Sequence, residues 1–366
     1  MLKAVFTGSN SSYQDLDKLN FPDYEPFGIQ DMIDNYSDFT RLLYRYSRLH
    51  PRPYSIVASR SCPFTCTFCI HGHRDIPYRA RSIESIMEEI RVTYEKYHFN
   101  ILILLDELFA VSKGRMNDFS DGVLEGKQKY GWDFDWMFQT HASAKLDLES
   151  LKKAKEAGCI SFSYGLESAS PVVLKSMDKR IKVEQVIEAI HLAKEAKIGF
   201  SANLIFGDPA ETQETIAESL AFWLEYGRGS CIFLAQLKPY PGSKIFQYCI
   251  EKGLIKDKKE YYETIDKCLI NMTAMSDETF NSFMSLLNHL ENQWLFVKTA
   301  KASYAIESPN GTVIEKLLGG EFVQIRTLCP NCGEESVYRM HRTDTKAPFF
   351  MGTSCLKCEQ KMKVIP

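Results

Sequence analysis

Short apolar runs alternate with amphipathic stretches along most of the chain, starting near residue 54. The runs are rich in β-branched and aromatic residues, which favours strands covered on both faces. They lie at 54–59, 101–105, 136–140, 159–165, 199–206 and 231–237. A helix is expected after Ser82, a good N-cap, because apolar residues follow it at helical spacing. Further helical patterns begin near Asp147, Val183, Thr212 and Ser243.

Six strands, each followed by a helix, predict an α/β fold with parallel pairing and right-handed crossovers. Two architectures share this pattern, a doubly wound open sheet and an incomplete barrel of six β/α units. Polar residues recur where several of the predicted strands end, and that edge carries the chemistry in β/α barrels. The pattern therefore favours a partial (β/α)6 TIM-like barrel.

Three further segments accompany this core, which is expected to occupy residues 54–255. Residues 1–53 are rich in Asp, Tyr and Pro and are expected to form an N-terminal arm. Residues 256–318 are expected to form a helical extension, with a last helix over 277–302. Residues 319–366 form a small segment that contains four cysteines.

Composition narrows the class of protein. The 366 residues are 45% hydrophobic and 25% charged, which excludes a disordered chain. The net charge of −3 provides no global basic field for nucleic acid, although a local patch stays open. The longest apolar runs are too short to span a bilayer, and no secretory signal is apparent. The expectation is a cytoplasmic protein without a membrane partner.

The cysteines carry the most chemical information. There are 11, an odd number that argues against a disulfide framework in a chain without a secretory signal. Seven fall in tight clusters, which is typical of metal sites. The remaining four are isolated in the sequence and are expected to be buried free thiols: Cys159, Cys231, Cys249 and Cys268.

The first cluster places Cys62, Cys66 and Cys69 on one loop directly after the first predicted strand. Three thiolates can ligate three irons of a cubane cluster and leave the fourth iron without a protein ligand. An open metal position is what a catalytic site needs. The alternative is a zinc loop, to which His71 or His73 would add the fourth ligand.

This loop resembles that of the radical S-adenosylmethionine (SAM) superfamily, whose signature is this cysteine spacing with an aromatic residue before the third cysteine, here Phe68. Residues 15–255 more narrowly resemble the subgroup that carries cobalamin-binding domains. The stretches that carry the resemblance are 16–19, 22–24, 59–63, 78–82, 105–109, 165–168, 206–212 and 239–243.

The resemblance implies a [4Fe-4S] cluster on Cys62, Cys66 and Cys69 that binds SAM through its open iron. Reductive cleavage of SAM would give a 5′-deoxyadenosyl radical for hydrogen abstraction from an unknown substrate. The implied cofactor contacts are Phe68, Asp106, Glu107, Glu167, Ser201 and Asn203, with no other catalytic residue assigned. An electron donor of the flavodoxin or ferredoxin type is implied as a partner. For the three acids, a helix cap or a surface ion pair is the simpler alternative.

Three features depart from the resembled subgroup. Only 53 residues precede the first strand and the D-x-H-x-x-G cobalamin motif is absent, so the chain is expected to lack a cobalamin domain. Use of cobalamin through a partner stays open. His141 stands where the subgroup usually has Arg, and Ala210 where it usually has Gly. The alanine is tolerated unless the backbone there needs positive φ.

The second cluster consists of two C-x-x-C pairs: Cys329, Cys332, Cys355 and Cys358. Paired knuckles of this kind are typical of a four-thiolate structural zinc site, as in zinc ribbons and rubredoxin-like units. A segment of fewer than fifty residues is too small to fold on its core alone, so a metal would stabilise it. An auxiliary iron–sulfur cluster is the alternative.

The leading hypothesis is therefore a radical SAM enzyme. One alternative is a cobalamin-dependent radical SAM methylase that works with a separate cobalamin subunit. Another is a degenerate barrel that acts as a binding module through its zinc ribbon. Cleavage of SAM would distinguish the enzyme from the binding module.

Overall fold

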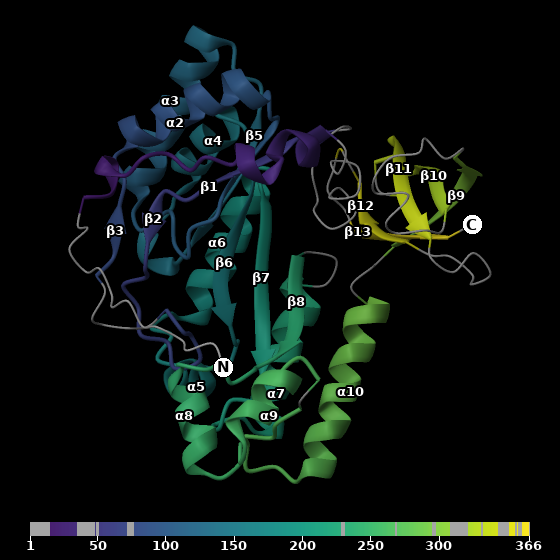
Figure 1. The fold of residues 1–366 in the computed structure, drawn as a ribbon. Helices are drawn as coiled ribbons and strands as arrows, with labels where there is room; N and C mark the ends of the chain where they lie inside the picture. Colours follow the sequence, from purple (N-terminus) through teal and green to yellow (C-terminus); the bar gives the residue numbers. More distant parts are fainter. Residues whose placement is uncertain are drawn as a thin grey trace, which may run out of the picture.

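The computed structural model describes residues 15–34, 48, 51–71, 77–227, 231–267, 269–294, 298–307, 321–330, 332–342, 351–355, 357 and 361–365. Its main sheet has six strands, all paired in parallel, in the order β1-β4-β5-β6-β7-β8 (Figure 1). Their bounds are β1 Pro53–Ile56, β4 Ile101–Leu104, β5 Asp135–Thr140, β6 Cys159–Glu167, β7 Gly199–Phe206 and β8 Cys231–Gln236. The six predicted strands are confirmed within a few residues.

The strand order decides between the two α/β architectures. Each new strand is added on the same side of the previous one, so the order never reverses. A doubly wound sheet would place later strands on both sides of the first. The fold is therefore an open, partial (β/α)6 barrel, as predicted, with the carboxyl ends of all six strands at one edge.

Helices fill the connections between these strands. Ser82, Asp147, Thr212 and Ser243 are N-caps whose side chains accept backbone N–H bonds, as their sequence positions predict. The helices are α2 Ile83–Tyr97, α3 Lys113–Tyr130, α4 Leu148–Glu156, α5 Pro171–Ser176, α6 Val183–Glu195, α7 Gln213–Phe222, α8 Lys244–Glu251, α9 Lys258–Thr264 and α10 Asp277–Trp294. Short helical turns are Leu16–Lys18, Glu25–Phe27, Ala142–Ala144 and Trp223–Gly227. No described helix is both long and apolar enough to cross a membrane.

Helix α3 is the expected helix after β4, but its start is not among the helical patterns located in the sequence, because three glycines weaken its helical signal. One of them has a packing role. A Cβ at Gly126 would come within 2.0 Å of the Trp132 ring, so the glycine lets the indole lie against the helix backbone. The aromatic core continues from there into the sheet, where Phe119 meets Trp136 edge to face at 4.8 Å between ring centroids.

The described part of the N-terminal arm packs against the start of the barrel. The Asp17 carboxylate accepts the Ser82 N–H at 3.0 Å and so adds a second acceptor at the start of α2. Ile33 is buried in the main core, and the Tyr24 ring packs edge-on against Tyr54 at 6.1 Å. The described part of the arm therefore adds few residues to the core, among them Ile33.

The C-terminal region forms a second sheet with the order β11-β10-β9-β13-β12. Its strands are β9 Lys298–Ile306, β10 Glu321–Leu328, β11 Glu335–Arg342, β12 Met351–Ser354 and β13 Lys361–Ile365. A two-stranded ribbon, β2 Ser59–Arg60 with β3 Arg79–Ala80, completes the sheets. Figure 1 shows the C-terminal sheet beyond α10 and beside the barrel.

The prediction of one helix over residues 277–302 is wrong at its carboxyl end. Helix α10 ends at Trp294, and residues 298–306 are a strand that pairs with both β10 and β13. The physical reason is a change of period. From Ala300 onward, apolar residues recur at spacing two at Ala302, Tyr304 and Ile306, which suits a strand.

Candidate functional site

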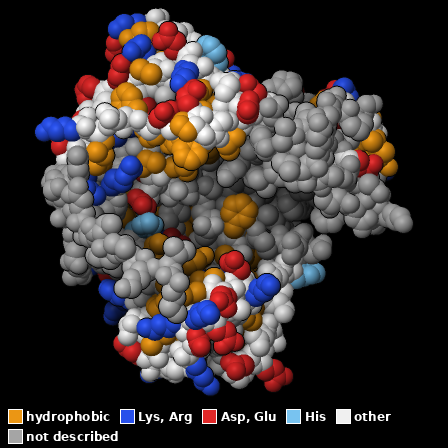
Figure 2. All heavy atoms as spheres, viewed as in Figure 1, with side chains coloured by type: hydrophobic (Ala, Val, Ile, Leu, Met, Phe, Trp, Pro, Cys, Tyr) orange, Lys and Arg blue, Asp and Glu red, His pale blue; other side chains and the backbone are white. Residues whose placement is uncertain are grey.

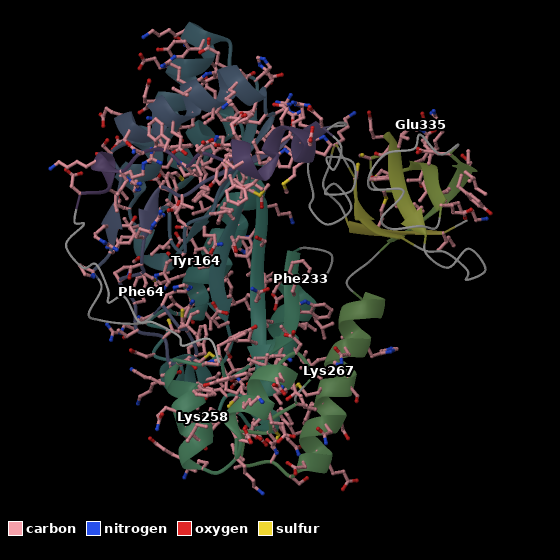
Figure 3. All side chains as sticks on the ribbon, viewed as in Figure 1. Phe64, Tyr164, Phe233, Lys258, Lys267 and Glu335 are labelled. Carbon is pink, nitrogen blue, oxygen red and sulfur yellow. The ribbon has the colours of Figure 1, made fainter. Side chains whose placement is uncertain are left out.

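The three clustered cysteines converge on one cavity of about 190 Å³ at the carboxyl edge of the main sheet. Cys66 is buried, whereas Cys62 and Cys69 are partly exposed. The same cavity is lined by Phe68, Glu107, Glu167 and Asn203, four of the predicted cofactor contacts, and by residues that include Phe64, His141, Tyr164 and Lys179. Figure 3 shows Phe64 and Tyr164 near each other beside β6.

The donor set fits an iron–sulfur cluster. Burial raises the pKa of all three thiols, that of Cys66 to about 11, so a metal would have to displace their protons. Soft thiolates in this number suit iron and leave one position open. For the zinc alternative, His71 lines the cavity, and its Nδ1 lies 3.3 Å from Glu107 Oε1. His73 lies outside the described residues.

The structure separates the two neighbouring acids that follow β4. Glu107 lines the cavity, whereas Asp106 is 1% exposed and is not among the residues that line it. The Asp106 Oδ1 accepts the hydroxyl of Ser59 at 2.7 Å and the Ser59 N–H. Burial raises the pKa of Asp106. The contact joins the end of β4 to β2 and is neither a helix cap nor a surface ion pair.

The two predicted contacts on β7 also differ. Asn203 lines the cavity, but Ser201 does not, and its hydroxyl donates to the Phe162 carbonyl at 3.4 Å. The turn after β7 has Gly207 at φ 114°, whereas Ala210 is not among the residues with positive φ. Alanine in place of glycine is therefore compatible with the backbone at that position.

Glu167 reaches the cavity through an irregularity at the end of β6. The pairing of β6 with β7 shifts register between Tyr164 and Glu167, and Glu167 has φ 66°, which is uncommon for a residue with a side chain. Its Oε1 lies 2.9 Å from Lys179 Nζ in an ion pair whose side chains are 14% and 7% exposed. Glu167 is thus neither a helix cap nor a surface charge.

Lys179 also lines the cavity, although no pattern in the sequence marks it as a site residue. It lies in the turn between α5 and α6, and its ammonium is 5.9 Å from the centre of the Phe68 ring. A Cβ at Gly165 would come within 2.4 Å of the Lys179 nitrogen, so this glycine leaves room for the side chain. Within the run Asp178-Lys179-Arg180 a lysine looks like a surface residue, and no local pattern marks it as buried.

His141 supports the site without carrying charge. Burial lowers its pKa to about 4, so the imidazole is neutral near pH 7. Its Nδ1 accepts the Ser143 N–H, which leaves the ring proton on Nε2, 3.4 Å from the Lys179 carbonyl. Its ring packs on Phe64 of the cysteine loop at 3.9 Å between centroids. His141 therefore joins the loop to the turn that carries Lys179.

The C-terminal cysteines form a second cluster in the described residues. The thiol sulfurs of Cys329, Cys332 and Cys355 lie within 4.8 Å of one another, and Cys358 falls outside the described residues. Cys329 and Cys332 lie between β10 and β11, at one edge of the C-terminal sheet, and Cys355 follows β12 at the other edge. A metal here would join the turns of two hairpins and hold the two edges of the sheet together.

One protein family matches the part of the chain that carries the cysteine loop. Residues 56–222, which include the cysteine loop and strands β4 to β7, match the Radical SAM superfamily, so the chain contains a radical SAM domain.

The chain is also similar to several curated proteins. The chain is 31% identical over 220 residues to the uncharacterized methyltransferase PH0819 of Pyrococcus horikoshii, covering 58% of this chain and 46% of that protein. It is 28% identical over 260 residues to the anaerobic magnesium-protoporphyrin IX monomethyl ester cyclase of Rubrivivax gelatinosus, covering 71% and 44%. The chain therefore spans less than half the length of these two relatives. Among solved structures, the radical SAM methyltransferase TsrM from Kitasatospora setae aligns with a TM-score of 0.49 and 17% identity, over 56% of this chain and 37% of that one.

Proposed function

We propose that this chain is a radical SAM enzyme that abstracts a hydrogen atom from a substrate still to be identified. The observation that carries the proposal is the convergence of three thiols and a buried Glu–Lys pair on one cavity at the carboxyl ends of the barrel strands. Three thiolates leave one iron open, and a carboxylate beside an ammonium complements the zwitterionic methionine part of SAM.

The residues divide into two groups by their position. Cys62, Cys66 and Cys69 would hold the cluster. Of the predicted cofactor contacts, Phe68, Glu107, Glu167 and Asn203 face the cavity, and Lys179 joins them as a cation for the methionine carboxylate. When bound, the cluster would supply the single electron that splits SAM into methionine and a 5′-deoxyadenosyl radical, which takes a hydrogen atom from the substrate. The surrounding side chains would orient SAM and exclude water.

Cleavage of SAM tests the proposal. The protein is reconstituted with iron and sulfide under anaerobic conditions, reduced with dithionite, and given SAM, and 5′-deoxyadenosine is measured. Formation of 5′-deoxyadenosine is expected for the unmodified chain and for Cys159→Ala, a buried cysteine outside the loop. The Cys66→Ala variant should produce none. If Cys66→Ala forms 5′-deoxyadenosine at the normal rate, the assignment of the loop is wrong.

A second candidate is a cobalamin-dependent methylase that obtains cobalamin from another subunit. It is favoured by the names of several relatives, which include methyltransferases acting on bacteriochlorophyllide d in Chlorobaculum tepidum. A methylase of this kind would release S-adenosylhomocysteine as well as 5′-deoxyadenosine. We expect the isolated chain to bind no cobalamin stoichiometrically. Near-equimolar co-elution of hydroxocobalamin on gel filtration would contradict that expectation and favour the methylase.

The remaining assignments are proposals of the same kind. We propose that Cys329, Cys332, Cys355 and Cys358 bind a structural zinc ion, because four thiolates at hairpin turns are typical of such sites. We also propose an electron donor of the flavodoxin or ferredoxin type as the physiological reductant. The division into an arm, a barrel core, a helical extension and a metal-binding segment stays a prediction, with β9 now part of the C-terminal sheet.

A further inference from the structure

The turn from Met177 to Arg180, between α5 and α6, is hydrogen-bonded to the cysteine loop. The hydroxyl of Thr65 donates to Asp178 Oδ2 at 2.5 Å, and Arg180 Nη2 donates to the same hydroxyl oxygen at 3.3 Å. Thr67 N–H donates to the Met177 carbonyl at 3.0 Å. Since Thr65 and Thr67 flank Cys66, the most buried of the three thiols is fixed on both sides by this one turn.

The same turn carries Lys179 into the cavity. Asp178 and Arg180 both have positive φ, 50° and 55°, and Lys179 lies between them. Asp178 and Arg180 pair with each other at 2.9 Å near the surface, while the Lys179 ammonium is buried against Glu167. The turn is therefore bonded to the cysteine loop through Asp178, and its Lys179 side chain lines the cavity proposed to bind SAM.

We propose that Asp178 is a positioning residue that couples SAM binding to the stability of the cluster, through its bond to Thr65. The inference rests on the proposed function, because it takes SAM to bind at Lys179. Binding there would restrain the turn, and the restrained turn holds Thr65 and Thr67 around Cys66. Coupling between two sites is reciprocal in binding free energy, so a turn that SAM restrains should in turn favour the bound cluster, and iron should be lost more slowly.

The test measures the rate at which a chelator removes iron from the reconstituted, oxidised protein, with and without saturating SAM. In the unmodified chain SAM should slow the loss about fivefold or more, the lower range of coupling between two sites. Thr65→Val keeps the shape of the buried side chain but removes its hydroxyl. In this variant the ratio of the two rates should be at least about twofold smaller than in the unmodified chain, because the bond that transmits the restraint is gone and only the bond of SAM to the open iron still slows the loss.

A second variant guards against a failure of Thr65→Val to fold. Asp178→Asn keeps an acceptor for Thr65 and tolerates positive φ, but it loses the charge that holds Arg180. Its ratio should lie between those of the unmodified chain and Thr65→Val. The double variant should be no worse than Thr65→Val, because both changes act on one contact.

Two control variants distinguish a positioning role of the Thr65–Asp178 contact from a purely structural role. Thr93→Val removes an equally buried hydroxyl on α2, and Asp147→Asn removes the ion pair with Lys113, and both should leave the ratio unchanged. If Thr65→Val speeds iron loss equally with and without SAM, the contact is merely structural and the proposal is overturned. If the unmodified chain binds no SAM, the proposed function fails as well. If the unmodified chain binds SAM normally but Thr65→Val leaves the ratio of the two iron-loss rates unchanged, only the proposed coupling is overturned.

Discussion

Glu167 and Lys179 hold each other in a buried ion pair, with 2.9 Å between Oε1 and Nζ, on the wall of the cavity that the three thiols line. Removing two charges from water is costly, and the pair is tolerable only because each partner compensates the other. The zwitterionic end of SAM offers each of them a second partner of opposite charge. Under the proposed function, the pair would therefore link the stability of the barrel to the binding of SAM.

Replacing one partner should destabilise the fold. Glu167→Gln leaves the Lys179 charge buried and unpaired, which should lower the free energy of unfolding by about 3–5 kcal/mol. Lys179→Met should have a similar effect, because Glu167 is then unpaired. The double variant should recover most of the loss, since neutral side chains of similar size replace the pair. Urea unfolding of the four proteins measures this, and additive losses in the double variant would contradict it.

The same variants should weaken SAM binding in a different pattern. A charge-assisted hydrogen bond contributes about 1.5–3 kcal/mol, so Glu167→Gln should lower SAM affinity roughly 10- to 150-fold. The double variant should stay weak although its stability returns, because both complementary charges are gone. Calorimetry on cluster-loaded protein gives the affinities. Recovery of affinity together with stability would show that the pair acts only on folding.

Gly165 should be needed for the position of Lys179 rather than for folding. A Cβ at Gly165 would lie 2.4 Å from the Lys179 nitrogen, the mobile end of a long side chain. Gly165→Ala should therefore fold and load iron but bind SAM several-fold more weakly. Gly114→Ala on α3, whose nearest contact would be at 3.9 Å, is the matched control and should leave affinity unchanged. Equal affinity in both variants would contradict the role of Gly165.

Much of the fold could be predicted from the sequence because its signals are local. The apolar run at Ile101–Leu104 and the N-cap at Ser82 each determine their element without distant contacts. The start of helix α3 could not be located, because three glycines, one of which packs against Trp132, weaken its pattern. The sequence places the end of the last helix at residue 302 instead of Trp294, because the change to period two in residues 298–306 is short and follows the helix closely.

Some residues of the candidate site could likewise be predicted from the sequence, and others could not. The cysteine loop is a contiguous signature, and the position after a strand brings Glu107 and Glu167 to the cavity. Lys179 is separated from Glu167 by a helix, and only the turn with two positive-φ residues brings them together. Asp106 and Glu107 are neighbours in the sequence, and only the contact of Asp106 with Ser59 shows which one faces away from the cavity.

A buried carboxyl group after β7 should make stability depend on pH. Burial raises the pKa of Glu211 to about 8, and its Oε2 accepts the Gly207 N–H. A folded pKa above the unfolded value near 4.5 means that protonation stabilises the fold below pH 4.5 and that this contribution is lost as the pH rises to about 8. The loss should be on the order of a few kcal/mol. Glu211→Gln should flatten the dependence of unfolding free energy on pH over this window, whereas the exposed Glu218→Gln should not. A slope unchanged by Glu211→Gln would contradict this account.

The C-terminal sheet should depend on its own metal. Because small metal-binding units fold with the ion, Cys329→Ala with Cys355→Ala should release zinc and unfold β10 to β13, without loss of iron from the barrel. Metal analysis and limited proteolysis measure both effects. About four iron atoms and one zinc ion per chain are expected before mutation. About eight iron atoms without zinc would instead indicate an auxiliary cluster.

The most direct test of the central claim is the spectrum of the reduced cluster before and after SAM is added. In the unmodified, anaerobically reconstituted chain we expect the electron paramagnetic resonance signal of one [4Fe-4S]⁺ cluster, and its shape should change when SAM binds the open iron. A chain with Cys62, Cys66 and Cys69 all replaced by Ala should lose this signal and keep its zinc. A triple variant that retains the signal, or an unmodified cluster whose signal does not respond to SAM, would contradict the account.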